Sequence, residues 1–314
     1  MDASTSAGGG RRLGKRLAKD SGRIPEGAGQ EDTASPEDNW YQCRCGSRHW
    51  GPLGTAGLLV SHGDRVLLQL RSANSHNGGT WGLPGGARRA AESPLKTALR
   101  EASEEAGLDA ERLSPTWWVI ADHVGWTYTT IAAQAEADPL GGPSNWETTR
   151  LEWVEPGRVA GFNLHPGLRQ MWPTLELLVA QRATLIVDAA NVMGSRPDGW
   201  WKDRAGAARR LRDELEPLAV RGLANTASTA PAGWYPQLVL VVEGQARGIG
   251  QGKNVTVVDA PGEGDDEIVA QARAAVARGA GPVEVVTADK GLTARLVAAG
   301  ATVMRPGGLL QVIR

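Results

Sequence analysis

A short helix with an unfavourable arrangement of charge constrains this chain more than any other stretch of its sequence. Ser93 and Pro94 are residue types that begin helices, and Gly107 is one that ends them, so we expect a helix over residues 94–106. One stripe of this helix is apolar and would face a core. The stripe consists of Leu95, Ala98, Leu99 and Ala102.

The remaining face of the helix gathers three carboxylates. Glu101, Glu104 and Glu105 are related by helical spacings of three and four residues, so their side chains converge. Acids in the last turn of a helix oppose its dipole, at a cost of roughly 0.3 to 1 kcal/mol each. A hard divalent cation reverses that cost, because it prefers carboxylate oxygens. The helix alone fits either a metal site or a solvated acidic face with Arg100 paired to Glu104.

The residues that flank the helix favour the metal site. A pattern of fixed residues and spacings begins at Gly86 and ends at Leu108. Its fixed positions are Gly86, Glu92, Arg100, Glu101, Glu104, Glu105, Gly107 and Leu108. This pattern resembles the Nudix hydrolase signature, G-x5-E-x7-R-E-U-x-E-E-x-G-U, with the smaller Ala102 in one bulky-aliphatic position. The resemblance extends over roughly residues 40–173.

The resemblance implies an α/β/α sandwich with a mixed sheet, hydrolysing a nucleoside diphosphate linked to another group. It implies that Mg²⁺ or Mn²⁺ is bound by the carbonyl of Gly86 and by Glu101, Glu104 and Glu105. It also implies that Arg100 orients Glu101 and pairs with Glu92. A carboxylate outside the motif often completes such sites. Glu147 and Glu152 are candidates, with a plain surface charge as the alternative for each.

Aromatic and basic residues near this motif have two interpretations each. Arg71 follows a predicted strand and either reaches a phosphate or lies exposed. Tryptophans at three positions either stack on a base or pack on the sheet; they are Trp117, Trp118 and Trp126. We interpret His123 and His165 as packing or loop-anchoring residues. Cys43 and Cys45, with His49, also have two interpretations: half of a zinc site or structural cysteines. Their one-residue gap and the lack of a second Cys pair favour structural cysteines.

The second half of the chain changes pattern. It contains five short apolar runs, at residues 184–187, 237–242, 255–258, 283–286 and 302–304. Helical patterns lie between most of them, at residues 203–216, 265–278 and 291–299. Continuous apolar strands that alternate with helices are typical of a doubly wound parallel sheet. We expect a loop at residues 222–236, and we predict a disordered tail at 1–38, a first domain at 39–182 and a second at 183–314.

Acidic residues follow several of these strands. They are Asp188, Glu243, Asp289 and the pair Asp265-Asp266. Each aspartate alone is explained as a helix cap. Because ligands collect at the carboxyl ends of parallel strands, the acids together predict a cluster that binds Mg²⁺ for phosphodiester hydrolysis.

Three short segments of this half resemble the NYN/PIN-like nuclease family over roughly residues 184–306. They are residues 187–192, 264–266 and 286–292. The resemblance implies a metal-dependent ribonuclease with Asp188, Asp266 and Asp289 as core acids. Asp265 would also bind metal, with assistance from Asn191 and from Asp203 or Glu243. Trp200, Trp201, Lys202 and Arg204 either contact RNA or form a packed turn.

Composition excludes one class of function and leaves one alternative open. Lys and Arg number 34 against 35 Asp and Glu, a net charge of -1, so the chain lacks the basic excess of a protein devoted to duplex nucleic acid. Local basic patches stay open. We expect no membrane span, no signal peptide and a cytoplasmic enzyme. The expected partners are a nucleoside diphosphate-type substrate and RNA. The alternative is a non-catalytic regulator that senses a nucleotide and binds RNA or a partner.

Overall fold

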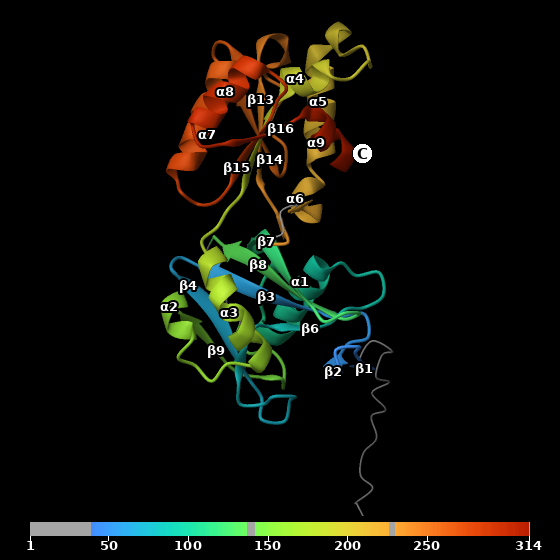
Figure 1. Ribbon diagram of the computed structural model, residues 1–314, viewed down its shortest axis with the longest axis vertical. Coiled ribbons are helices and arrows are strands. Elements are labelled where there is room, and N and C mark those ends of the chain that lie inside the picture. The colour runs from blue at the N-terminus through green and yellow to red at the C-terminus, as the bar shows by residue number, and fades with distance from the viewer. Residues whose placement is uncertain (1–38, 137–141, 226–229, 314) are drawn as a thin grey trace, which may run out of the picture. The chain divides into compact units, whose positions relative to one another are not determined.

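The computed structural model describes residues 39–136, 142–225 and 230–313. The predicted tail at residues 1–38 and part of the predicted loop at 222–236 lie outside the described residues. The described chain forms a short N-terminal hairpin and two larger sheets (Figure 1). The hairpin pairs β1 (Trp40–Gln42) with β2 (Arg48–Trp50).

The first sheet is mixed. Its order is β11-β12-β7-β8-β3-β4-β5, with β6 also paired to β3 and β9 to β4. Its strands from the first half are β3 (Thr55–His62), β4 (Arg65–Arg71), β5 (Trp81–Gly82), β6 (Gly85–Ala87), β7 (Leu113–Asp122), β8 (Thr127–Ala135) and β9 (Thr148–Val154). The pair β3–β8 is parallel and the other pairs are antiparallel. A turn at Gly63, with a φ of 57°, joins β3 to β4.

Helices cover both faces of this sheet. Helix α1 spans Pro94–Ala106 as predicted: Ser93 accepts a hydrogen bond from the Lys96 N–H, and Gly107 ends the helix with a φ of 63°. The apolar stripe of α1 packs on one face, while α3 (Pro166–Leu178) packs on the other. The short helix α2 spans Pro156–Val159. His165 caps α3 by accepting from the Gly167 N–H, which fits the predicted loop-anchoring role.

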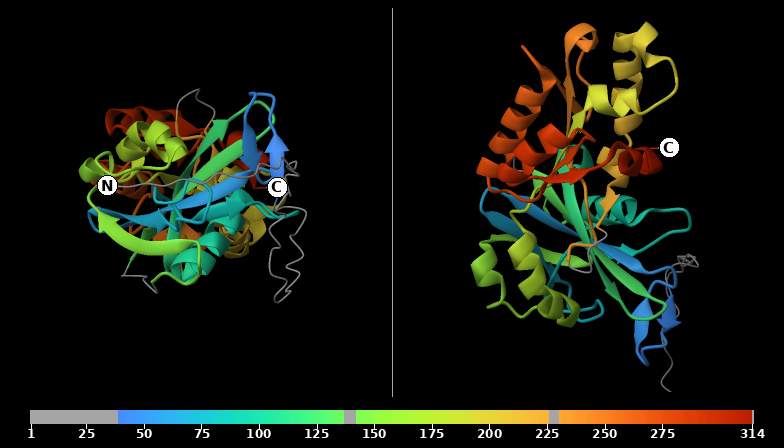
Figure 2. Two further views of the ribbon diagram at one scale, coloured as in Figure 1. Left: turned by 90° about the horizontal axis from the view of Figure 1, so that it is seen from below. Right: turned by 45° about the horizontal axis from the view of Figure 1, so that its top comes forward.

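The second sheet is parallel throughout. Its strands are β10 (Thr184–Asp188), β13 (Gln237–Val242), β14 (Val255–Asp259), β15 (Val283–Val286) and β16 (Thr302–Met304), in the order β14-β13-β10-β15-β16. Its helices are α4 (Ala189–Gly194), α5 (Arg204–Leu215), α6 (Leu218–Arg221), α7 (Gly264–Ala277), α8 (Lys290–Ala298) and α9 (Pro306–Val312). Core residues of α4, α5, α6 and α9 pack on one face, and those of α7 and α8 on the other (Figure 2).

This strand order places a topological switch point beside β10. The chain moves from β10 to β13 and β14 in one direction, and then returns to β15 and β16 on the opposite side of β10. Helices after β10 and β15 therefore begin on opposite faces of the sheet, which opens a crevice at the carboxyl ends of these strands.

The segment predicted as a loop at residues 222–236 instead contains two short strands. They are β11 (Leu223–Ala224) and β12 (Gly233–Trp234), and β12 pairs with β7 of the first sheet. A Cβ on Gly222 or Gly233 would overlap the Trp118 ring, so the strands approach the sheet closely because these positions are glycine. Turn-forming residues dominate this segment, and nothing local in it indicates pairing with a strand about a hundred residues earlier.

No helix within the described residues is both long enough and apolar enough to cross a membrane.

Candidate active site

Arg100 contacts three of the glutamates that surround the C-terminal half of α1. Its Nη1 donates to Glu101 Oε1 at 2.8 Å and to Glu104 Oε2 at 3.0 Å. Its Nη2 donates to Glu92 Oε2 at 3.2 Å and to the carbonyl oxygen of Ala87 at 3.0 Å. The side chains of Arg100 and Glu92 are only 15% and 7% exposed. One guanidinium thus fixes carboxylates that would otherwise repel each other.

Glu105 and Gly86 complete the oxygen-rich part of this group. The Gly85 N–H donates to Glu105 Oε2 at 2.8 Å, whereas Glu105 Oε1 is buried without a hydrogen-bond partner among the described residues. A Cβ on Gly86 would lie 2.5 to 2.9 Å from the carboxylate atoms of Glu101, so a larger residue would displace it. An unpaired buried oxygen is costly, and this set of oxygens suits a hard divalent cation.

Burial and neighbouring charges shift the pKa values of these residues. Burial favours the neutral acid of Glu92, but hydrogen bonds from Arg100 and Thr97 hold its pKa below the ordinary range. The carboxylates raise the pKa of Arg100, although its burial acts against them. Burial raises the pKa of Glu101 and raises that of Glu105 to about 8.

Glu147 joins these glutamates, and Glu152 does not. The charge of Glu147 adds to the effect of burial on the pKa of both Glu101 and Glu105, so it lies near both. Its loop is held on α1 by Ser144, whose hydroxyl donates to the Glu104 carbonyl at 2.6 Å. Glu152 instead forms a surface ion pair with Arg150 at 2.8 Å.

A partly buried tyrosine beside the glutamates had no signal in the sequence. The Tyr128 hydroxyl fills the space that a Cβ on Gly57 would take. Burial, assisted by the charge of Glu105, raises the pKa of Tyr128 to about 12. Arg71 is close enough to act on the same pKa, and its Nε donates to the His76 carbonyl at 3.0 Å.

Two of the three tryptophans considered as base-stacking residues are buried. Trp117 is fully covered and donates from Nε1 to the Leu178 carbonyl at 2.7 Å. Trp126 donates to the Gly51 carbonyl at 2.8 Å. These two residues pack within the fold.

The acids of the second sheet surround a cavity of about 570 Å³ at its switch point. Polar side chains in its lining are Asp188, Asn191, Ser195, Glu243, Asp265 and Asp289. No Lys or Arg of the described chain lines it. The strand order thus brings together acids that lie about a hundred residues apart.

Backbone amides hold these acids in place. Asp188 caps α4 by accepting from the Asn191 N–H at 2.9 Å, and it also accepts from the Thr287 hydroxyl at 2.9 Å. Asp289 caps α8 through the Leu292 N–H at 2.7 Å.

Glu243 accepts from the Gly264 N–H at 2.6 Å. Burial raises the pKa of Asp188, and the charges of Asp265 and Glu243 add to that shift.

Two predicted members of this cluster lie outside the cavity. Asp266 pairs with Arg295 at 2.5 Å, and its side chain is 71% exposed. Adjacent helical residues point about 100° apart, so Asp265 and Asp266 cannot both face the cavity. Asp203 caps α5 by accepting from the Gly206 N–H at 2.8 Å.

Residues 200–204, considered for RNA contact, form a partly packed turn. The guanidinium of Arg204 lies 5.5 Å from the centroid of the Trp200 ring, and Trp201 is 56% exposed. Trp200 and Arg204 therefore form the packed turn, while the ring of Trp201 is exposed to solvent.

Comparisons with known proteins find relatives of the part of the chain that forms the first sheet and α1. A model of the NUDIX domain matches residues 52–178. "Putative 8-oxo-dGTP diphosphatase 3" of Mycobacterium tuberculosis is 44% identical over 156 residues, which cover 46% of this chain and 71% of the relative. A "Nucleoside triphosphate pyrophosphatase/Nudix hydrolase fusion protein" of Bifidobacterium longum is 34% identical over 163 residues, covering 49% of this chain and 34% of that protein.

A solved structure of a Nudix hydrolase from M. smegmatis is 43% identical, with a TM-score of 0.43, and the match covers 46% of this chain and 95% of that one. The family model includes the residues from Gly86 to Leu108. The chain therefore belongs to the Nudix family of hydrolases, which act on phosphoric anhydrides.

Proposed function

We propose that the glutamates around Arg100 bind Mg²⁺ or Mn²⁺ and hydrolyse the diphosphate linkage of a nucleoside diphosphate derivative. The observation that carries this proposal is that Arg100 holds Glu101 and Glu104 near Glu105, whose Oε1 is buried without a hydrogen-bond donor among the described residues. When bound, the metal neutralises charge on the diphosphate and lowers the pKa of coordinated water.

The residues of the chain prepare the site in two ways. Arg100 holds the carboxylates of Glu101 and Glu104 in fixed positions, and Glu92 holds Arg100. Arg71 and the Tyr128 hydroxyl supply a cation and a donor beside Glu105, where a phosphate or a sugar would be contacted. Rigid positioning of this kind reduces the reorganisation needed during reaction.

The names of the relatives suggest the first substrates to test. One relative is named as an 8-oxo-dGTP diphosphatase and another in part as a nucleoside triphosphate pyrophosphatase. We propose a nucleoside triphosphate with an oxidised base as the leading candidate. Nucleotide sugars and dinucleoside polyphosphates are the comparison substrates.

Glutamate substitutions test this proposal. Glu105→Gln removes a buried carboxylate from the cluster, so we expect hydrolysis of 8-oxo-dGTP with Mg²⁺ to fall by roughly 100-fold or more. Glu152→Gln is the matched control on the surface and keeps its activity. Release of nucleoside monophosphate measures both variants. Wild-type turnover by Glu105→Gln would refute the site, whereas turnover of a comparison substrate alone would change only the substrate.

We propose a second activity, metal-dependent RNA cleavage, for the cavity of the second sheet. Its acids gather at a switch point without a cation among the lining residues of the described chain, so their negative charge is available to bind one or two Mg²⁺ ions. The resemblance of residues 184–306 to NYN/PIN-like nucleases supports the same activity. The alternative is that this half binds RNA or a partner without cleaving it.

Two aspartates that cap helices separate these alternatives. Asp188→Asn and Asp203→Asn both keep a capping oxygen, but only Asp188 lines the cavity. We expect Asp188→Asn to abolish cleavage of a labelled single-stranded RNA with Mn²⁺ or Mg²⁺, and Asp203→Asn to retain it. Binding of that RNA by the wild-type protein without cleavage under either metal would support the alternative.

A further inference from the structure

The N-terminal hairpin forms no strand pair with either larger sheet in the described chain. Its turn runs from Cys43 to Ser47, with a hydrogen bond from the Cys43 N–H to the Ser47 carbonyl at 2.9 Å. Isolated two-stranded hairpins are marginally stable in water. The hairpin therefore needs another source of stability.

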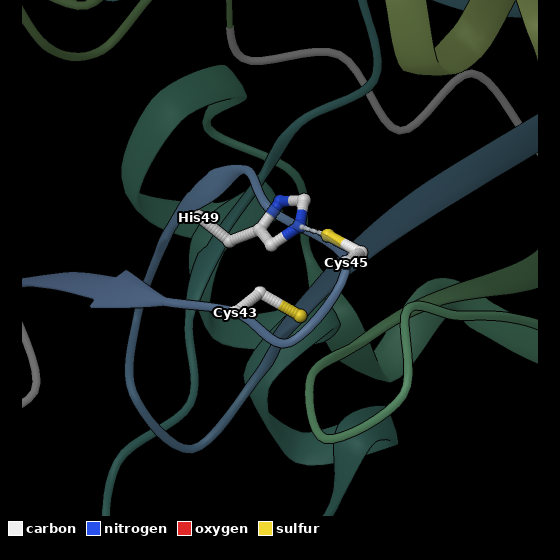
Figure 3. Close-up of side chains that lie close together, drawn as sticks. All are labelled: Cys43, Cys45 and His49. Atoms are coloured by element: carbon white, nitrogen blue, oxygen red, sulfur yellow. Dashed lines mark hydrogen bonds between the residues drawn. The ribbon is translucent and has the colours of Figure 1, made fainter.

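Three side chains of this hairpin that commonly bind metals point toward one another (Figure 3). The sulfur atoms of Cys43 and Cys45 and a ring nitrogen of His49 all lie within 4.8 Å of one another. Cys45 Sγ lies 3.2 Å from His49 Nε2. Antiparallel pairing produces this convergence, because His49 returns on β2 opposite Tyr41 while the two cysteines occupy the turn.

We propose that Cys43, Cys45 and His49 bind a zinc ion, with His123 as the fourth ligand. Tetrahedral zinc with bonds of about 2.3 Å to sulfur and 2.0 Å to nitrogen separates its ligand atoms by about 3.5 to 3.8 Å. The 3.2 Å between Cys45 Sγ and His49 Nε2 is slightly shorter than this range, and all three ligand atoms lie within 4.8 Å of one another, so small side-chain adjustments would accommodate the ion. Cysteine and histidine ligands favour zinc over Mg²⁺, which prefers oxygen.

His123 belongs to the turn between β7 and β8 of the first sheet. Its ring centroid lies 4.6 Å from that of His49, and its carbonyl accepts a hydrogen bond from Cys43 Sγ at 2.8 Å. The ring nitrogens of His123 are not among the ligand atoms that lie within 4.8 Å of one another, so the ring would have to turn toward the hairpin to bind the ion. The zinc would then join the hairpin to the first sheet, next to the stacking of His49 on Trp126 at 4.1 Å.

Zinc binding changes the protonation of the two cysteines. Each thiol forms a sulfur–zinc bond as its proton passes to solvent, so one zinc ion releases two protons. Cys43 also loses its hydrogen bond to the His123 carbonyl. A purely structural role for Cys43 would instead preserve that hydrogen bond and need a thiol or hydroxyl donor.

This difference makes Cys43→Ser the deciding variant. A serine hydroxyl can donate to the His123 carbonyl but is a poor zinc ligand. We expect the full-length protein, dialysed against excess Mg²⁺, to retain about one zinc per chain by elemental analysis. Cys43→Ser and the exposed Cys45→Ser should lose it, and Ser47→Ala in the same turn should keep it. His62→Gln is the control for histidine, because His62 lies on β3.

Two further measurements guard against adventitious metal. Cobalt added to the zinc-free protein should give thiolate charge-transfer absorption that Cys45→Ser reduces and Glu105→Gln leaves unchanged. Trypsin should cleave after the exposed Arg44 and Arg48 faster when zinc is removed. A wild-type protein that binds neither zinc nor cobalt through thiolates would overturn the proposal. Cysteine variants that keep their zinc would overturn it as well.

Discussion

The two acidic clusters are held together by different means. In the first, one guanidinium contacts Glu92, Glu101 and Glu104. In the second, Asp188 and Asp289 accept backbone N–H groups at the beginnings of helices, and no Lys or Arg lines the cavity within the described chain. Both arrangements offset repulsion between carboxylates, but the first uses a full charge and the second uses helix dipoles.

This difference determines how each cluster responds to change. In the first cluster Arg100 alone contacts Glu92, Glu101 and Glu104, so one substitution releases three carboxylates at once. The second distributes the same task over separate helix ends and the Thr287 hydroxyl. We therefore expect the first cluster to be more sensitive to substitution of one supporting residue.

Arg100→Ala should have the largest effect. It leaves the buried carboxylate of Glu92 without its cation and frees Glu101 and Glu104 to repel each other. We expect stability to fall by about 2–4 kcal/mol and hydrolysis to fall at least about 100-fold. Urea denaturation and single-turnover hydrolysis measure the two effects.

Arg89→Ala is the matched control. Arg89 also approaches Glu104, at 3.7 Å, but both side chains are about half exposed. Such surface pairs contribute about 0 to 1 kcal/mol. Equal losses for Arg89→Ala and Arg100→Ala would show that no single residue maintains the first cluster.

His165 caps α3 with a side chain that titrates, so the stability of the protein should depend on pH. Burial lowers the pKa of His165 from 6.5 to about 4, and Arg71 and His76 add to the shift. His165 Nδ1 accepts from the Gly167 N–H at 3.2 Å only while the imidazole is neutral. As pH falls below about 6.5, the unfolded chain binds a proton that the folded protein excludes, so stability declines until about pH 4.

We expect this loss to be about 1–2 kcal/mol, because solvent screens part of the shift at a partly exposed ring. His165→Asn keeps a capping oxygen without titrating in this window. The difference between the denaturation curves of wild type and His165→Asn at pH 7 and pH 4.5 measures it. Parallel pH profiles for the two proteins would exclude His165 as their cause.

Asp266→Asn should have the smallest effect. Asp266 pairs with Arg295 on the surface, so we expect a change in stability of no more than about 0.5 kcal/mol and unchanged RNA cleavage. Asp265→Asn, one residue earlier, should reduce cleavage because Asp265 lines the cavity. A reversed ranking of these two variants would place the second cluster on the other side of α7.

Local patterns in the sequence were sufficient to predict helix α1 and the strands of the second sheet. Helix α1 lies where its caps indicate, and the five strands of the second sheet lie on the five apolar runs. The sequence did not predict that β12 pairs with β7, because this contact depends on the Trp118 ring fitting over glycines far along the chain.

The site residues, like the helices and strands, could be predicted where local spacing determines their positions. The residues around Arg100 come from one helix and one adjacent loop, so spacing alone predicts their convergence. The sequence did not distinguish Glu147 from Glu152. The position of Glu147 depends on a loop held by Ser144, and no motif marks that loop. The sequence also did not show whether Asp265 or Asp266 faces the cavity. That depends on how α7 is turned about its own axis, which a pair of adjacent acids does not specify.

The strand β12 also bears on how such a chain can be divided. Trp234 pairs with Trp117, so a polypeptide that ends at residue 182 lacks the strand next to β7. Its sheet would end in an open edge flanked by exposed tryptophans, a template for association with other copies. Gene fragments that separate the two halves at the change in sequence pattern would therefore yield a first half that aggregates. When second halves are exchanged between related proteins, residues 222–236 would have to stay with the first half whose sheet they complete.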